Sequence, residues 1–145
     1  MSQSSGADFE SMGYLLGRVC RLHHSRAREL LEGLGLYRGQ PPLLHALHEQ
    51  EGLTHSDLAE RLHVTPATIT KMIRRMERAG FVQREHDVED QRVSRVYLTE
   101  AGRAIQTEMM EVLRELDKET FHGLTETERA LLRRFLLKIR DNLSQ

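Results

Sequence analysis

A cluster of basic side chains lies between Thr65 and Arg84. It contains one acid, Glu77, and five cations: Lys71, Arg74, Arg75, Arg78 and Arg84. The local charge balance is therefore +4, whereas the whole chain of 145 residues has a formal net charge of -1. A basic patch on a near-neutral protein favours a polyanionic partner such as nucleic acid. Charge alone leaves a second interpretation open, that of a solvated helix face.

The spacing of the apolar residues in this stretch predicts a helix from about Thr65 to Ala79. Thr65 is a good N-cap, Pro66 suits the first helical position, and Gly80 is a natural left-handed stop. One face carries an apolar stripe of Ile69, Met72, Ile73 and Met76. The other side carries Ala67, Lys71, Arg74 and Arg78, with Thr68 and Arg75 on one shoulder and Thr70 on the other. The cations therefore lie together on the outer face.

A shorter helix precedes the basic one. Thr54 and Asp57 have the spacing of a capping box, and the helix that they begin ends near Leu62. Two helices joined by so short a turn are typical of a helix-turn-helix, whose second helix lies in the major groove of DNA. Small residues near the start of that helix, Thr65, Ala67 and Thr68, let the backbone approach bases or phosphates.

After Val82 the pattern becomes strand-like. Residues 83–86 and 93–98 are predicted strands, joined by a polar, charged hairpin tip, so that the lobe is a winged helix. In the tip, Asp90 could hold the guanidinium of Arg92 through charge-assisted hydrogen bonds and point it toward the neighbouring minor groove. The alternative is an ordinary surface ion pair that stabilises the fold by well under about 1 kcal/mol.

The run from Leu53 to Gly102 resembles the multiple antibiotic resistance regulator (MarR) family of transcription factors. The resemblance lies in LTHSDLAERLHVTPATITKMIRRMERAGFV and in the wing sequence DQRVSRVYLTEAG. The wing fits the family's pattern at Asp90, Arg92, Val96, Leu98, Thr99 and Gly102. Gln91 departs from it, because many members have a second basic residue in the wing-tip motif. The resemblance implies a dimeric winged-helix protein, usually a repressor, that a small ligand, a metal or oxidation releases from DNA.

Helical patterns flank this lobe on both sides. We predict a mainly α-helical chain with a small β-wing, divided into an N-terminal dimerisation helix (8–36), a winged helix-turn-helix lobe (42–98, with the wing at 82–98) and C-terminal dimerisation helices (99–143). The pair Pro41-Pro42 should begin the first helix of the lobe, and Thr125 with Glu128 should cap the last helix of the chain.

The terminal helices carry more apolar surface than one small lobe can cover, which favours a homodimer. A two-fold dimer would place its two basic helices about 34 Å apart, which predicts an inverted-repeat operator.

Sensing residues are harder to assign. Cys20 is the only cysteine, and the nearby Arg18 and Arg21 could favour its thiolate and a redox switch. The alternative is a packed or partly exposed thiol that does not react. Some MarR relatives sense peroxide or bind zinc, so that a redox- or metal-sensing regulator is an alternative. No set of four ligands can be placed for a metal, however, and we expect neither a metal nor another cofactor. The family's effector pocket lies between the dimerisation helices and the DNA-binding lobe. The resemblance suggests for its lining Tyr14, Arg18, His24, Tyr37 and His45.

The remaining features bear on the class of protein. The sequence holds no phosphate-cradling glycine loop, no nucleophile elbow and no paired cysteine site, so we expect a protein that is not an enzyme. No apolar run approaches the roughly 20 residues that span a bilayer, and the first residues show no signal pattern, which favours the cytoplasm and no membrane partner.

From the basic helix and the wing, we predict that double-stranded DNA is bound by Thr65, Ala67, Thr68, Thr70, Lys71, Arg74, Arg75 and Arg92. The competing hypothesis is a winged helix that binds only other proteins.

Overall fold

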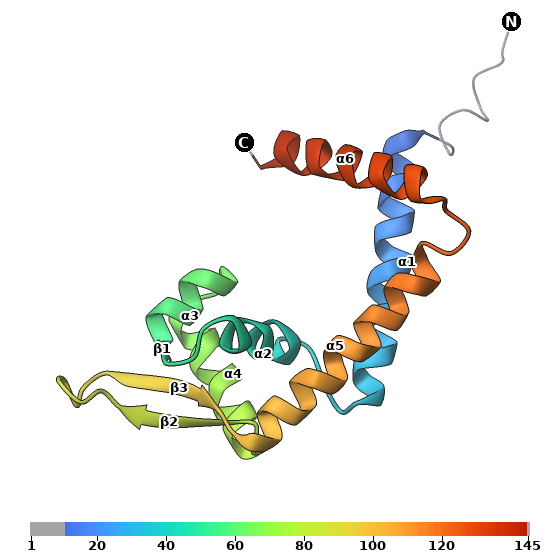
Figure 1. Cartoon of the computed structure of the whole chain (residues 1–145). Helices are drawn as coiled ribbons and strands as arrows, with labels where there is room; N and C mark the ends of the chain where they lie inside the picture. The colour runs from blue at the N-terminus through green and yellow to red at the C-terminus, as the bar shows by residue number, and fades with distance from the viewer. Residues whose placement is uncertain (1–10, 145) are drawn as a thin grey trace, which may run out of the picture. The chain divides into compact units, whose positions relative to one another are not determined.

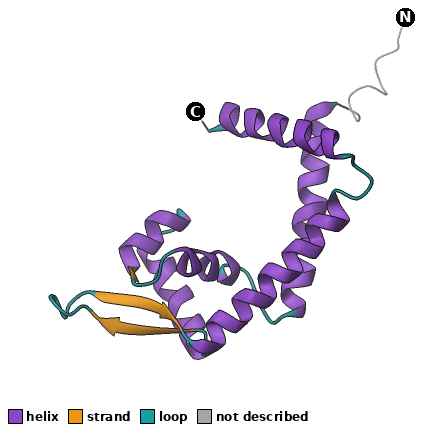
Figure 2. Ribbon diagram, viewed as in Figure 1, coloured by secondary structure: helices purple, strands orange, loops and turns teal. Residues whose placement is uncertain are grey.

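The computed structural model describes residues 11–144. In these residues the chain is mainly helical, with a small antiparallel sheet, as expected (Figures 1 and 2). The elements in chain order are α1 (Met12–Gly33), α2 (Gln40–Glu49), β1 (Leu53–Thr54), α3 (His55–Leu62), α4 (Pro66–Arg78), β2 (Val82–His86), β3 (Ser94–Leu98), α5 (Glu100–Thr120) and α6 (Glu126–Leu143). The expected start of the first helix at Asp8 lies outside the described residues.

Two compact units divide the chain within α5, after Leu113. The first unit holds the helix-turn-helix and the wing. The second consists of the last turns of α5 and the whole of α6. The earlier division into 8–36, 42–98 and 99–143 stays a prediction.

Local capping fixes the helix-turn-helix. The amide of Asp57 donates to Thr54 Oγ1 at 3.1 Å, and the amide of Thr54 donates to Asp57 Oδ2 at 3.1 Å, which confirms the capping box of α3. His63 then takes a left-handed conformation (φ 55°) that ends α3 and turns the chain. The amide of Thr68 donates to Thr65 Oγ1 at 3.2 Å, so Thr65 caps α4 as expected. Gly80 (φ 84°) ends α4.

The sheet has the strand order β1-β3-β2, and both pairings are antiparallel. Val82 pairs with Leu98 and His86 pairs with Ser94 across the hairpin. The predicted strand bounds were off by one residue, since β2 begins at Val82 and β3 at Ser94. The sequence did not reveal β1, because two residues are too few to show an alternating pattern. β1 anchors the wing strand β3 to the residues that begin α3.

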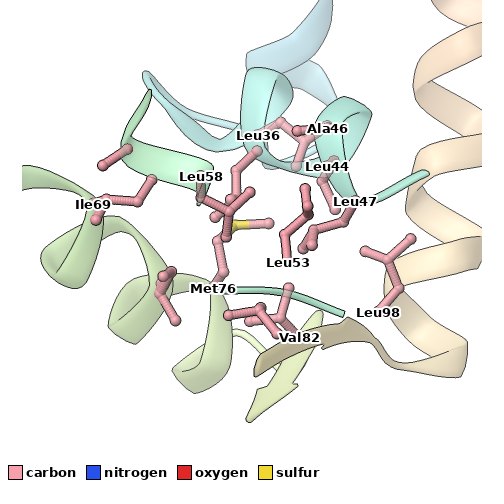
Figure 3. Packing of buried hydrophobic residues seen from close by; sticks show 14 of the residues in the cluster. Leu36, Leu44, Ala46, Leu47, Leu53, Leu58, Ile69, Met76, Val82 and Leu98 are labelled. Carbon is pink, nitrogen blue, oxygen red and sulfur yellow. The ribbon is translucent and has the colours of Figure 1, made fainter. Parts of the chain in front are cut away.

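One apolar core joins α2, α3, α4 and the three strands (Figure 3). Fully buried side chains come from α2, α3, α4 and the sheet: Leu43, Leu44, Leu47, Leu58, Ile69, Ile73, Met76 and Val96. Met72, expected on the buried stripe, is only half-buried and packs at the edge of the core. Because α4 buries one face among so many partners, its opposite face is held toward solvent.

The starts of α2 and α6 lie at or near the residues that the sequence predicts. α2 begins at Gln40, two residues before the expected Pro42, because the Gln40 side chain accepts a hydrogen bond from the amide of Tyr37 at 2.8 Å. The predicted box at the start of α6 is confirmed. The amide of Glu128 donates to Thr125 Oγ1 at 3.1 Å, and that of Thr125 donates to Glu128 Oε1 at 3.0 Å.

Candidate nucleic-acid interface

The outer face of α4 carries four exposed cations, Lys71, Arg74, Arg75 and Arg78. Over residues 11–144, the structure pairs none of these four with a carboxylate. Their charges are therefore available to a ligand rather than used within the fold. Sequence reasoning placed Arg78 on this face but left it out of the expected DNA contacts, and its exposure places it with the other three.

The fifth cation of the cluster has a different role. Arg84 on β2 binds Glu77 of α4 through two hydrogen bonds, Nε to Oε2 at 2.9 Å and Nη2 to Oε1 at 3.1 Å. This bidentate pair ties α4 to the wing strand β2. Of the five cations in the cluster, Arg84 is therefore paired with Glu77, and the other four have no carboxylate partner in the described residues.

His55 lies in the same electrostatic neighbourhood. Its Nε2 is buried without a hydrogen-bond partner among the described residues. Burial lowers the pKa of His55 below its usual 6.5, and the positive charge of Arg84 lowers it further, while Glu77 acts in the opposite direction. The imidazole therefore favours its neutral form beside the ion pair that joins α4 to β2.

The first turn of α4 is open to solvent. Thr65, Ala67 and Thr68 are exposed, and Thr70 is half-buried on the shoulder of the helix. The hydroxyl of Thr65 donates to that of Thr68 at 2.9 Å, so the two side chains are held together at the helix start. Short side chains and the positive end of the helix dipole suit close approach to a polyanion.

The wing presents a further exposed cation, Arg92. Arg92 Nε donates to Asp90 Oδ1 at 3.2 Å, and the amide of Arg92 donates to the same oxygen at 3.0 Å. The hydrogen bond expected between Asp90 and Arg92 is present, whereas the role of this pair in a DNA contact stays a prediction. The Arg92 side chain nevertheless remains 92% exposed, so its charge is oriented without being enclosed.

The two best-formed cavities of residues 11–144 are lined by residues other than the expected effector residues. All five are exposed: Tyr14, Arg18, His24, Tyr37 and His45. His45 contacts Glu49 of its own helix, with 2.9 Å between Nε2 and Oε1. Their assignment to a ligand pocket stays a prediction, as does a sensing role for Cys20, whose thiol is exposed.

A groove of about 530 Å³ lies in the second unit, between the end of α5 and the face of α6. Its apolar floor is formed by Phe121, Leu132, Leu136 and Leu137, and arginines line it. Beside the groove, Leu131 and Phe135 are 43% and 50% exposed. This unit therefore leaves a broad apolar surface uncovered.

Among residues 11–144, no three His, Cys, Asp or Glu side chains are grouped as metal ligands would be. No helix there is both long and apolar enough to cross a bilayer.

Comparison with known proteins gives this geometry a context. A family model described as the MarR family matches residues 36–94. The HTH-type transcriptional repressor Rv2887 of Mycobacterium tuberculosis is 32% identical over 133 residues, which cover 92% of this chain and 96% of the relative. The HTH-type transcriptional repressor IacR of Pseudomonas putida is 33% identical over 130 residues, which cover 90% of this chain and 78% of the relative.

Solved structures agree with the relatives found by sequence. A crystal structure of MarR is 26% identical, with a TM-score of 0.75 over 99% of this chain and 96% of that one. A structure of BpsR from Bordetella bronchiseptica is 28% identical, with a TM-score of 0.74 over 92% of this chain and 96% of that one. That structure concerns regulation of the DNA binding of BpsR by 6-hydroxynicotinic acid.

Proposed function

Because the chain belongs to the MarR family of winged helix-turn-helix regulators, we propose that it is a repressor that binds an inverted-repeat operator as a two-fold dimer. Like its named relatives, the chain is a DNA-binding regulator and not an enzyme. The observation that carries the operator proposal is the row of four exposed, unpaired cations on α4. A winged helix that binds only proteins would not need them.

The contacts divide between reading bases and holding the backbone. Each subunit inserts α4 into a major groove, where Thr65, Ala67, Thr68 and Lys71 approach base edges or nearby phosphates. Thr70, Arg74 and Arg75 mainly hold the phosphate backbone and so fix the register of the helix. Arg92, oriented by Asp90, reaches the adjacent minor groove, whose negative potential favours a guanidinium.

The dimer covers the apolar surfaces that a single chain leaves exposed. On α1, four apolar side chains recur at helical spacing and are all exposed: Met12, Leu15, Val19 and Leu22. On α6, Leu131, Phe135 and Leu136 are exposed as well. Contiguous apolar patches of this kind are unusual on the surface of a monomer, and a second copy of the same chain is the simplest cover.

A small effector regulates the operator complex. Support comes from BpsR, whose DNA binding is regulated by 6-hydroxynicotinic acid. An effector bound near Tyr14, Arg18, His24, Tyr37 and His45 changes the distance between the two α4 helices. Specific binding then falls, because the helices no longer match successive major grooves on one face of the duplex.

A gel shift with DNA from beside the protein's own gene tests the DNA-binding proposal. We expect a specific, salt-sensitive shift that Lys71→Ala and Arg92→Ala both weaken. Unchanged affinity in both variants would refute the contact assignment, and the absence of any specific shift would favour a protein-binding module.

Sedimentation of a charge-insertion variant tests the dimer separately. Phe135→Glu should give monomers, because it places a carboxylate on the apolar face of α6. Arg134→Glu, on the polar side of the same helix, is the matched control and should sediment as the wild-type dimer. A dimeric Phe135→Glu protein would remove α6 from the proposed interface.

A further inference from the structure

The tip of the wing is a closed, hydrogen-bonded loop. The amide of Asp87 donates to the carbonyl of Val93 at 2.9 Å, and the amide of Val93 donates to the carbonyl of Asp90 at 3.0 Å. The amide of Glu89 donates to Asp87 Oδ1 at 2.9 Å. The loop conformation is therefore fixed by its own contacts before any partner binds.

Arg95 anchors this loop to the body of the first unit. Its Nε donates to Asp87 Oδ2 at 3.0 Å, and its Nη1 donates to the carbonyl of Gly52 at 2.8 Å. The Glu89 amide and the Arg95 guanidinium hold the pKa of Asp87 below its usual value, so that the carboxylate stays ionised and the anchor persists. A loop held in this way loses little conformational entropy when it binds.

Val88 stands at the end of the anchored loop and is 99% exposed. Its neighbours in sequence, Asp87 and Glu89, are acidic, and it lies in the hairpin loop between β2 and β3 rather than on α1 or α6. Two of the tip carboxylates, Asp87 and Asp90, are engaged by Arg95 and Arg92. The tip thus presents one apolar side chain, Val88, between the cation Arg92, which Asp90 orients, and the exposed carboxylate of Glu89.

We propose that Val88 enters the minor groove beside Arg92, packs against the deoxyribose walls, and makes the wing select A·T pairs. The proposal rests on the proposed function, since it needs α4 in the adjacent major groove. In the minor groove, the amino group of guanine is the feature that separates G·C from A·T pairs. An apolar side chain pressed against that donor would leave it without a hydrogen-bond partner, and that desolvation opposes binding at G·C. Apolar side chains are used in minor grooves by other DNA-binding proteins.

Fluorescence anisotropy with the operator duplex, measured over a series of salt concentrations, tests the contact. Val88→Thr keeps the shape of the side chain and replaces one methyl group by a hydroxyl, and Val88→Ala removes two methyl groups. Each should weaken binding by about tenfold at every salt concentration, as expected for lost apolar burial. The salt slope should not change, because no charge is removed. Gln91→Ala, an exposed polar truncation in the same loop, should bind as the wild type does.

A modified duplex tests the selection of A·T pairs. Replacing the adenines under the wings by 2,6-diaminopurine adds an amino group in the minor groove and leaves the major-groove face of the base pair unchanged. Wild-type protein should bind this duplex about tenfold more weakly, and Val88→Ala should lose much less.

Two outcomes would overturn the inference about Val88. One is wild-type affinity in both Val88 variants, and the other is equal affinity of the wild-type protein for the adenine and diaminopurine duplexes. If Lys71→Ala still weakens binding in those experiments, the function of α4 stands and only the role of Val88 falls. If the wild-type protein shows no specific binding at all, the proposed function itself is refuted.

Discussion

Replacing Arg74 by Gln removes one charge from the outer face of α4 without disturbing the core. The Arg74 side chain is exposed and has no ion-pair partner in residues 11–144, so its loss breaks no internal contact. Gln keeps a similar length and helix propensity. The substitution should therefore leave stability within about 0.5 kcal/mol of the wild type and act on DNA binding alone.

The magnitude follows from counterion release. Each phosphate contact contributes about −0.9 to the slope of log K against log salt. A dimer carries two copies of Arg74, so the slope of the variant should be less negative by about 1.8. Over a fourfold rise in salt, from about 50 to 200 mM, the wild-type protein should lose about twelvefold more affinity than the variant does.

Anisotropy titrations of one operator duplex at four or more salt concentrations measure this slope. Arg134→Gln removes the same charge from the polar side of α6 and is the matched control, with an expected slope equal to that of the wild type. If Arg74→Gln and Arg134→Gln give the same slope, Arg74 does not touch phosphate and the orientation assigned to α4 is wrong.

Three further substitutions test the fold that presents α4. Gln106→Leu should stabilise the protein by about 1–3 kcal/mol in thermal denaturation, because the buried Gln106 amide has no hydrogen-bond partner in the described residues; a lower Tm would contradict this. Gly102→Ala should destabilise it by more than about 2 kcal/mol in urea, because a Cβ would overlap the backbone carbonyl of Phe81; unchanged stability would show that this contact can relax. Burial, and then the charge of Arg84, lowers the pKa of His55 in the folded protein. As the pH falls below 6.5, the imidazole of His55 is therefore protonated in the unfolded chain before it is protonated in the folded one. Wild-type stability should thus drop between about pH 7 and 5, and His55→Gln should flatten that drop, whereas parallel pH profiles would exclude His55 as the cause.

The sequence predicted the helix-turn-helix closely because its determinants are local. Thr54 is hydrogen-bonded to Asp57, and Thr65 to the amide of Thr68, each within the first turn of the helix that it begins. Gly80 ends α4 through its own backbone conformation. The outer face of α4 was predictable for a related reason. Helical periodicity sorts apolar from basic residues before any tertiary contact is known.

Long-range pairs could not be predicted in the same way. The bond from Arg84 to Glu77 spans seven residues between a helix and a strand, and that from Arg95 to the Gly52 carbonyl spans 43. Such contacts depend on how the elements pack, which the sequence pattern does not encode locally. For the same reason the sequence counted Arg84 in the basic cluster and did not reveal its ion pair with Glu77.

The most direct measurement of the central claim is DNA cleavage from a reagent attached to α4. Cys20 is the only cysteine, so a Cys20→Ser protein that carries Ala79→Cys can be labelled at one site with an iron chelate. Ala79 is exposed at the end of α4 and is not among the proposed DNA contacts. If α4 of each subunit occupies a major groove, the operator should be cut in two clusters about 10 base pairs apart. A single cluster, or cutting no stronger than from a label at Arg134→Cys on α6, would contradict the account.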